Sequence, residues 1–413
     1  MIVQNNPFLS HTFVKTWCEH FIKKGSALVF NFISIPFHKP SFLPLYVNAG
    51  STLTKGVSYE LFTEEPTDSL KNKALLIFDV PRYFKLEVGT SKKLGLLKVR
   101  QYPGYLIQLN DFTDLNDYLS KTFSKSSNQK FKRYQQRLEQ CFTIDYKVYH
   151  GAISKEAYER VFNSFYHLLT KRFDDKQTVN NNLFDHEWNF YHDVVYQMIL
   201  EKKASLYVIY SDQKPISVRL NYYSDEIIFD AITVFDIDYS KFHLGKISIM
   251  KVLEWAFENN YKQFDFSKGY FDYKESWGNL KYDFEYHILY NKKSLVSIVT
   301  ARIVYYIYKL KQYLRDQRLN EKFHKLTYAL KNKKTDTVGV TEVDAETLIN
   351  LDIDFKETKL ENLEWPYLKK EVYDFIFLAK EPIDNLKLST GCHEGKELLL
   401  METLQSKKIV QIN

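Results

Sequence analysis

The sequence contains little cysteine, glycine and proline, and each shortage excludes a class of protein. Its 413 residues include 3 Cys, 13 Gly and 10 Pro. Cys18, Cys141 and Cys392 lie far apart, so they offer neither a disulfide framework nor the paired spacing of a zinc site, and we expect no bound metal. The low glycine and proline content argues against a glycine-rich nucleotide-loop protein, a collagen and a long flexible linker.

Long apolar runs are also missing. No stretch approaches the roughly 18 consecutive apolar residues of a membrane span, and runs such as residues 74–78 have the length of a strand. The opening MIVQNNPFLSHTF lacks the basic region and apolar core of a secretory signal. We therefore expect a protein of the reducing cytoplasm.

The overall composition is that of a globular protein, and its charge is distributed unevenly along the chain. Hydrophobic residues make up 45% and aromatic residues 16%, enough for a sizeable core in two or three domains. The net charge is +6, but residues 336–413 hold 16 Asp+Glu against 9 Lys+Arg, a net of −7, so the remainder carries +13. A basic body with an acidic tail favours an anionic ligand, such as nucleic acid or a phosphorylated cofactor.

The pattern of apolar residues predicts a mixed α/β protein. We expect two α/β units over residues 1–150 and 151–294, a long helix region over residues 295–330 and an acidic appendage over residues 331–413. The predicted helices are residues 8–21, 115–140, 155–169, 184–201, 246–259 and 296–318. The predicted strands are residues 28–35, 45–48, 74–80, 105–109, 142–149, 204–210, 215–223, 227–234, 263–266, 284–290, 372–378, 398–400 and 409–412.

The long helix has an apolar stripe flanked by basic residues. The stripe consists of Val296, Val299, Ile303, Ile307, Leu310 and Leu314. Amphipathic helices usually face their own core, so we predict that this stripe packs on the second unit. The alternative is that it lies on an anionic membrane surface.

Residues 230–279 carry the most chemical information. They read as a strand, a polar loop, a helix start, a strand end and a loop containing glycines. A helix start offers unpaired N–H groups and the positive end of the dipole. Gly245 permits close approach of a ligand and Lys246 adds a charge, so this corner suits a pyrophosphate.

The same segment resembles a known family. The pattern D-F-x-x-G-x-x-x-Y-K-x-x-W-G is met by Asp265, Phe266, Gly269, Tyr273, Lys274, Trp277 and Gly278. Together with FDIDYSKFHLGK at residues 235–246, it resembles the GNAT-type acyltransferases of the cellulose-biosynthesis (CelD-like) group, distant relatives of the FemABX aminoacyltransferases. The resemblance covers roughly residues 6–290 and leaves the tail without a counterpart.

The resemblance implies two GNAT-like units in tandem, of which the second transfers an acyl group, acetyl in the simplest case, from acyl-CoA to an amine or hydroxyl. The acceptor would be a sugar nucleotide, a lipid-linked sugar or another cell-envelope precursor. In this fold two parallel strands, here residues 227–234 and 263–266, separate to admit the pantetheine arm. The implied CoA-binding residues are Val234, His243, Gly245, Lys246 and Ile247.

The sequence departs from the family pattern at one loop, and this leaves the identity of the acyl donor open. The loop HLGKIS has one glycine, whereas the standard pyrophosphate loop of the fold reads Q/R-x-x-G-x-G/A. An aminoacyl-tRNA, the donor of the FemABX relatives, would also suit a basic body. A third possibility is a non-catalytic module that keeps the fold and has lost the chemistry.

Two residues are the predicted catalytic groups. Lys274 would stabilise the charged transition state, as the matching lysine of the FemABX relatives is thought to do; otherwise it is a surface lysine. Asp265 would accept the proton of the attacking amine or hydroxyl; otherwise it caps the turn that follows it. Asp236 and Asp238 compete for the role of base.

Four further residues are predicted to contact the substrate, in addition to Asp236. Arg219 lies mid-strand and needs an anionic partner, either the substrate or Asp230 on the neighbouring strand. Arg172 is a weaker candidate of the same kind. Tyr273 and Trp277 flank Lys274 and would either wall the acceptor site or pack in the core.

Overall fold

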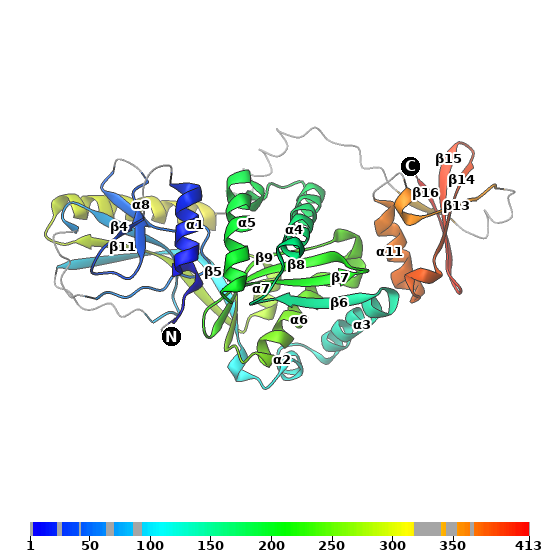
Figure 1. The fold of residues 1–413 in the computed structure, drawn as a ribbon, viewed down its shortest axis with the longest axis horizontal. Coiled ribbons are helices and arrows are strands. Elements are labelled where there is room, and N and C mark those ends of the chain that lie inside the picture. Colours follow the sequence, from blue (N-terminus) through cyan, green and yellow to red (C-terminus); the bar gives the residue numbers. More distant parts are fainter. Residues whose placement is uncertain are drawn as a thin grey trace.

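The computed structural model describes residues 3–22, 27–40, 43–62, 70–85, 93–317, 340–343, 353–363 and 367–412. It confirms the mixed α/β class: a large sheet carries helices on its faces, and a smaller sheet lies at one end of the molecule (Figure 1). Among the described residues, no helix is both long enough and apolar enough to cross a membrane.

The large sheet runs through the whole body of the protein. Within the described residues it has eleven strands in the order β1-β2-β3-β4-β11-β5-β10-β9-β8-β7-β6. Their bounds are Leu28–Val29 (β1), Pro36–His38 (β2), Leu45–Asn48 (β3), Ala74–Pro81 (β4), Leu94–Gln108 (β5), Ile144–Tyr149 (β6), Ala204–Ser211 (β7), Lys214–Tyr223 (β8), Ile227–Phe235 (β9), Gln263–Lys268 (β10) and Leu280–Asn291 (β11). We call β1–β5 with β11 the N-terminal half, and β6–β10 the C-terminal half.

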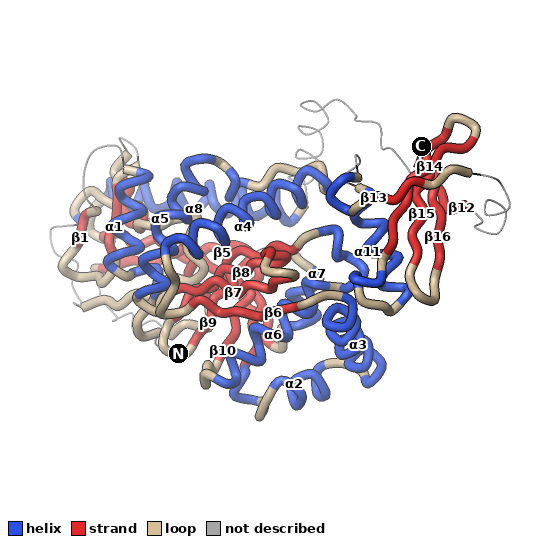
Figure 2. The backbone as a smooth tube through the Cα atoms, turned by 45° about the vertical axis from the view of Figure 1, so that its right-hand side comes forward, coloured by secondary structure: helices blue, strands red, loops and turns tan. Residues whose placement is uncertain are grey.

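Helices cover both faces of the C-terminal half (Figure 2). On one face, α4 (Lys155–Asp175), α5 (Asp185–Leu200) and α1 (His11–Phe21) share a core with β7, β8 and β9. On the other, α6 (Leu244–Glu258) packs with α2 (Leu115–Thr122) and α3 (Lys125–Cys141). The predicted inward positions of α4, from Tyr158 to Leu169, are buried, and Ser154 caps that helix by accepting from the Ala157 N–H.

The two halves are joined by β5 and β11. β5 pairs with β10 on one side and with β11 on the other, and β11 continues to β4. The boundary at residue 150 stays a prediction. β6, which precedes that residue, pairs with β7, which follows it, so strands from both predicted units are neighbours in one sheet.

The prediction for the long helix was wrong about which face it buries. α8 (Leu295–Asp316) packs on β4, β5 and β11 of the N-terminal half, and its buried residues are Ser297, Ala301, Val304 and Gln312. The predicted stripe from Val296 to Leu314 is exposed. The small side chains of Ser297 and Ala301 allow close approach to the sheet, a signal that apolar periodicity alone does not contain.

The tail forms a small sheet and a helix. Its strands are β12 (Val340–Val343), β13 (Lys356–Thr358), β14 (Lys387–His393), β15 (Lys396–Glu402) and β16 (Lys407–Ile412), in the order β12-β16-β15-β14-β13. The predicted strand over residues 372–378 was wrong, because that segment lies in α11 (Leu368–Ala379) and buries Leu368, Val372 and Ile376 at helical spacing. Most of residues 295–330 is α8, while the end of that range lies outside the described residues.

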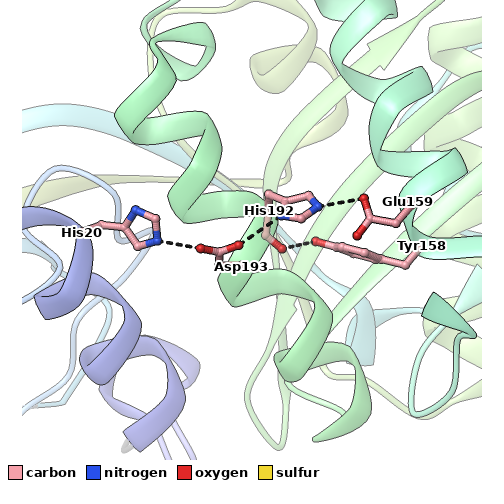
Figure 3. Close-up of polar contacts among 5 residues, drawn as sticks. All are labelled: His20, Tyr158, Glu159, His192 and Asp193. Atoms are coloured by element: carbon pink, nitrogen blue, oxygen red, sulfur yellow. Dashed lines mark hydrogen bonds and ion pairs between the residues drawn. The ribbon is translucent and has the colours of Figure 1, made fainter. Parts of the chain in front are cut away.

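A chain of polar contacts joins three helices on the outer surface (Figure 3). His20 of α1 lies 2.9 Å from Asp193 of α5. His192 contacts Asp193 at 3.1 Å and Glu159 of α4 at 3.0 Å. Burial lowers the pKa of His192, but the hydrogen bonds to Glu159 and Asp193 outweigh it and raise that pKa overall. These contacts link α1, α5 and α4. The side chains that form them are partly exposed.

Candidate functional site

The parallel strands β9 and β10 separate after a short stretch of pairing. They pair at Ile227–Gln263, Ile228–Phe264 and Phe229–Asp265, where the shared ladder ends. Beyond that point β9 continues along β8, and β10 continues along β5. The two strands therefore form a wedge, with Asp230 and Phe266 as the first residues beyond the last pair.

Each strand is irregular at the wedge. The register of β9 against β8 shifts at Asp230–Ile232, which leaves Ala231 as an extra residue. The register of β10 against β5 shifts between Asp265 and Lys268. Ser267 lies in that shift with φ of 60°, a left-handed conformation that costs free energy in a non-glycine residue. Strain of this kind is concentrated at functional sites, which makes the wedge the leading candidate.

Asp265 is fully buried at the head of the wedge. Its carboxylate accepts hydrogen bonds from the Tyr83 hydroxyl at 2.8 Å and from the Tyr282 hydroxyl at 2.6 and 2.7 Å to its two oxygens. It also accepts the Ser267 N–H at 2.7 Å, which is the turn-capping contact considered from the sequence. Burial raises the pKa of Asp265 to about 6, although the hydrogen bonds oppose the shift. The group therefore exchanges its proton close to neutral pH.

Lys274 is buried too, on the short helix α7 (Asp272–Trp277). Its ammonium donates to the Phe266 carbonyl at 2.6 Å and to the Lys268 carbonyl at 3.0 Å. These are carbonyls of β10 at the wedge, so Lys274 is not the solvated surface lysine that we considered as the alternative. Burial lowers the pKa of Lys274 to about 8, opposed by the negative charges of Asp230 and Asp265.

Arg219 finds its partner within the protein. Its guanidinium lies 2.8 Å from Asp230, and its Nε donates to Ser248 Oγ of α6 at 3.3 Å. Thr233 also donates to Asp230, at 3.0 Å. Arg219 and Asp230 are both buried, so this ion pair fixes the start of the wedge on the β9 side.

The N-terminal half contributes residues that sequence reasoning missed. Asp79, fully buried on β4 with φ of 60°, forms an ion pair with Lys268 at 2.5 Å and accepts from Thr54 at 2.8 Å. The half-buried Lys55 adjoins Thr54, and it lies close enough to Lys268, Asp79, Lys274 and Asp230 for their charges to act on it. Burial, together with Lys268, lowers the pKa of Lys55 to about 8. The sequence offered one signal, a carboxylate directly after the apolar run A-L-L-I-F at residues 74–78.

The start of α6 has features that fit a diphosphate. No side chain caps the helix. Within the part of the chain that the structure describes, the N–H groups of Leu244 and Gly245 have no acceptor, whereas the Lys246 N–H bonds to the His243 carbonyl at 2.8 Å. A Cβ on Gly245 would lie 2.9 Å from the Phe235 ring, so any other residue here would have to displace that ring. Free N–H groups beside a cation suit an anion.

Other side chains partly cover the same corner. The His243 ring lies 4.0 Å from the ring of Tyr134 on α3. The Lys246 ammonium lies over Phe131 and Tyr134, also on α3, at 5.4 and 5.6 Å. Ile247 and Val234 are buried in the core, one on each face of the sheet. Among the predicted CoA-binding residues, His243, Gly245 and Lys246 are thus partly accessible, and Ile247 and Val234 act through packing.

The remaining predicted residues are placed around this region in different roles. Arg172 of α4 stacks over Phe235 at 4.5 Å, beside the wedge. Asp236 and Asp238 lie 2.6 and 2.5 Å from Lys171, so both carboxylates serve a structural ion pair. Trp277 is buried against Tyr118 of α2 and Phe131 of α3, which is the core alternative that the sequence left open. Tyr273 is 40% exposed.

No group of His, Cys, Asp or Glu in the described ranges could hold a metal ion. Cys141 is buried, and burial raises the pKa of its thiol to about 11, so it does not provide a nucleophile. The side chains gathered at the wedge include the carboxylate of Asp265, the cationic group of Lys274 and the hydroxyl groups of Tyr83 and Tyr282.

Comparison with known proteins finds a family model that matches part of the chain. Residues 125–275 match the model of the acetyltransferase (GNAT) domain. No curated protein matches the sequence. The matched segment begins at the first residue of α3 and includes β9, α6, β10 and most of α7.

Solved structures resemble the chain over a wider range at low identity. FemX is 11% identical, with a TM-score of 0.46 over 69% of this chain and 92% of its own. A conserved protein of unknown function from Bacteroides thetaiotaomicron VPI-5482 is 10% identical, with a TM-score of 0.43 over 70% and 92%. A tandem GNAT protein from the clavulanic acid biosynthesis pathway is 6% identical, with a TM-score of 0.32 over 61% and 77%.

These structural resemblances concern the fold alone, and the sequence match covers residues 125–275. The match does not reach the N-terminal half or the tail, and the CelD-like group stays a prediction. Over residues 125–275, the chain is similar to acetyltransferase domains of the GNAT type, whose general activity is acyl transfer.

Proposed function

We propose that the protein transfers an acyl group from acyl-CoA to an amine or hydroxyl of a larger acceptor. The acceptor would be a sugar nucleotide, a lipid-linked sugar or another cell-envelope precursor, and acetyl is the simplest acyl group. The observation that carries the proposal is the wedge: β9 and β10 are parallel, pair at three positions and then separate beside α6. A thioester arm needs a slot of this kind, open at a helix start that can hold its diphosphate.

The reaction itself needs few groups. The acceptor nitrogen or oxygen attacks the thioester carbonyl, a C–N or C–O bond forms, and the C–S bond breaks to release the CoA thiol. The acceptor loses one proton, which a base must take. Holding both substrates in the wedge supplies much of the rate, because it replaces a bimolecular encounter with an oriented one.

Asp265 and Lys274 are our candidates for the chemical roles. Asp265, with its pKa of about 6, is mostly ionised at neutral pH and can accept the acceptor's proton directly or through the hydroxyl of Tyr83 or Tyr282. Lys274 places a positive charge beside the carbonyls that end β10. A cation positioned near a developing oxyanion is worth about 3 kcal/mol.

Two measurements test this function. Acyl-CoA should raise the melting temperature at concentrations above its dissociation constant, and release of free thiol should depend on an added amine or sugar acceptor. Lys274→Ala should lower turnover by about a hundredfold. Lys281→Ala is the matched control, because that lysine is exposed, forms an ion pair with Glu275 at 3.1 Å and lies over the Tyr105 ring at 5.3 Å. Wild-type turnover in Lys274→Ala would remove Lys274 from the mechanism.

A second candidate donor is an aminoacyl-tRNA. It is favoured by two observations: Phe235 covers Gly245, and α3 presents the exposed cations Lys125, Lys130, Lys132 and Arg133 beside the α6 start. Binding of charged tRNA would weaken steeply with salt, because released counterions dominate its free energy. A melting temperature that ignores a panel of acyl-CoAs but rises with charged tRNA would replace the first donor with the second.

A further inference from the structure

One face of α8 exposes an unusual amount of apolar surface. Its members are 38% to 76% exposed and are Leu295, Val296, Val299, Ile303, Tyr306, Ile307, Leu310, Tyr313 and Leu314. At about 100° per residue they occupy roughly a third of the helix circumference, as one stripe along six turns. A continuous row of exposed apolar side chains of this kind marks an interaction site. We call these nine residues the α8 stripe.

The opposite face of α8 is already used. Ala301 and Val304 are buried against β-sheet residues of the N-terminal half, including Tyr286 and Ile288. Ser297 Oγ accepts the Asn291 N–H at 2.8 Å, which fixes the start of the helix on the sheet. The helix therefore packs on the sheet of the N-terminal half by one side (Figure 1), and the residues of the α8 stripe are exposed.

Cations flank the α8 stripe on both sides. Arg302 and Lys309 lie along one edge and Lys311 along the other, and all three are exposed. Lys292 and Lys293, also exposed, precede the helix. Asp316 is the one acidic residue of α8, and it lies 2.7 Å from Arg100. An apolar stripe bordered by positive charge is complementary to a surface of acyl chains beneath anionic headgroups.

We propose that α8 docks the protein on the surface of an anionic lipid bilayer, with its axis in the membrane plane and the α8 stripe inserted below the headgroups. Arg302, Lys309 and Lys311 would then face the lipid phosphates, while the tyrosine hydroxyls of Tyr306 and Tyr313 stay at the headgroup level. The α8 stripe contains none of the residues that we place at the wedge, and the proposal holds whichever acyl donor is used.

A second copy of the chain fits this surface less well. Two α8 helices packed stripe against stripe would bring the flanking cations of both copies together, with no acidic residue of the helix free to offset them. Like charges placed together at an interface disfavour association. A bilayer with anionic lipid satisfies the apolar stripe and the cations at the same time.

Vesicle co-sedimentation of the full chain tests the proposal. We expect binding to phosphatidylcholine vesicles that contain phosphatidylglycerol, and much weaker binding to phosphatidylcholine alone. The double variant Ile303→Glu and Ile307→Glu should lose at least about tenfold in partitioning. Replacing Arg302, Lys309 and Lys311 by Gln should cost about fivefold per cation on the anionic vesicles and little on the neutral ones.

A matched control keeps this test specific. Val179 and Leu404 are apolar residues, 60% and 79% exposed, that lie outside α8. The double variant Val179→Glu and Leu404→Glu makes the same charge change and should bind vesicles like the wild type. In Tyr306→Trp, vesicles should shift the tryptophan emission to shorter wavelength, because the ring enters an apolar layer.

Three results would overturn the proposal. The first is no binding of the wild-type chain to anionic vesicles. The second is equal loss of binding in the control variant. The third is a stable dimer in sedimentation velocity that Ile303→Glu and Ile307→Glu dissociate, because the stripe would then be a contact between copies. Acyl transfer to a water-soluble acceptor should be unchanged in the stripe variants, so failure here is distinguishable from failure of the proposed function.

Discussion

Burial moves the two candidate catalytic groups toward each other in pKa. A poorly solvated site disfavours the charged form of each group. Burial therefore raises the pKa of the Asp265 carboxyl to about 6 and lowers the pKa of the Lys274 ammonium to about 8. Between these values the carboxylate is mostly ionised and the ammonium mostly protonated. That is the combination which proton removal and oxyanion stabilisation require.

We therefore expect a bell-shaped dependence of kcat/KM on pH. Activity should fall below about pH 6, where Asp265 becomes protonated, and above about pH 8, where Lys274 loses its charge. Asp265→Asn should remove the base and lower kcat/KM by about a hundredfold or more. Lys274→Arg should keep a positive charge at high pH, so its alkaline limb should move upward. Initial rates of thiol release from pH 5 to 10 provide the measurement.

Lys55 supplies the control for the alkaline limb. Its pKa is also lowered to about 8, and it lies in the same charged cluster. Lys55→Arg should leave the limb near pH 8 if Lys274 is responsible. If the alkaline limb of the kcat/KM profile moved in Lys55→Arg but not in Lys274→Arg, the titrating group would be Lys55 instead.

At the scale of elements, the pairing of β5 with β11 positions the Tyr282 side chain for its hydrogen bonds to Asp265, and it does so because a glycine of β5 leaves room for the ring. Gly104 of β5 is the partner of Tyr282 of β11, and a Cβ on Gly104 would lie 2.4 Å from the tyrosine ring. The ring therefore lies across the glycine, which directs its hydroxyl to Asp265. The same arrangement recurs where Gly95 faces Tyr290, with a Cβ distance of 2.2 Å.

Gly104→Ala should damage activity more than stability. The new methyl group would push Tyr282 away from Asp265 and change the hydrogen bonding of the candidate base. Overpacking of this kind costs about 1–3 kcal/mol of unfolding free energy, and we expect kcat to fall at least about tenfold. Gly95→Ala is the matched control, because it disturbs the same strand pair away from Asp265. Equal kcat in the two variants, after melting temperatures are compared, would contradict a role for the Tyr282 contact.

Elements were predictable from sequence where periodicity and local signals agree. The strand predicted at residues 45–48 is β3. The helical spacing of apolar residues predicted α4 and α5. The segment of α11 from Val372 to Leu378 is rich in β-favouring residues, and its helical state depends on burial against η5 (Ile237–Phe242) and α3. α8 shows a different limit of the sequence. Its periodicity identified an apolar stripe correctly, but periodicity does not say whether the rest of the protein buries that stripe.

The candidate site was predictable in part for the same reason. The motif from Asp265 to Gly278 identified Lys274 and Asp265, which lie together at the end of β10. Tyr83, Asp79 and Lys55 come from the N-terminal half, roughly 180 to 220 residues away in the chain from β10. Only the joining of both halves through β5 brings them there, and no local pattern encodes that pairing.

At the scale of the whole molecule, a helix of the tail packs against the proposed donor side of the site. α11 packs on η5, the segment that leads from β9 into α6. Tyr373 of α11 lies 4.6 Å from Tyr239, and Phe377 lies 5.1 Å from Phe242. Within the described part of the tail, α11 therefore adds to the core, and its packing on η5 supports the helix start at Gly245.

Removing one of these contacts should weaken donor binding. Tyr373→Ala would leave a cavity beside Tyr239 and Phe142, at a cost of about 3–5 kcal/mol for a large aromatic residue, and a lower melting temperature. Because η5 then loses support, the dissociation constant for acyl-CoA should rise several-fold by calorimetry. Leu400→Ala is the control: Leu400 is buried in the tail's own cluster with Leu398 and Ile409, and it should cost stability without changing donor affinity. If donor affinity followed melting temperature equally in both variants, the tail would act on stability alone, and the bracing of α6 through η5 would be wrong.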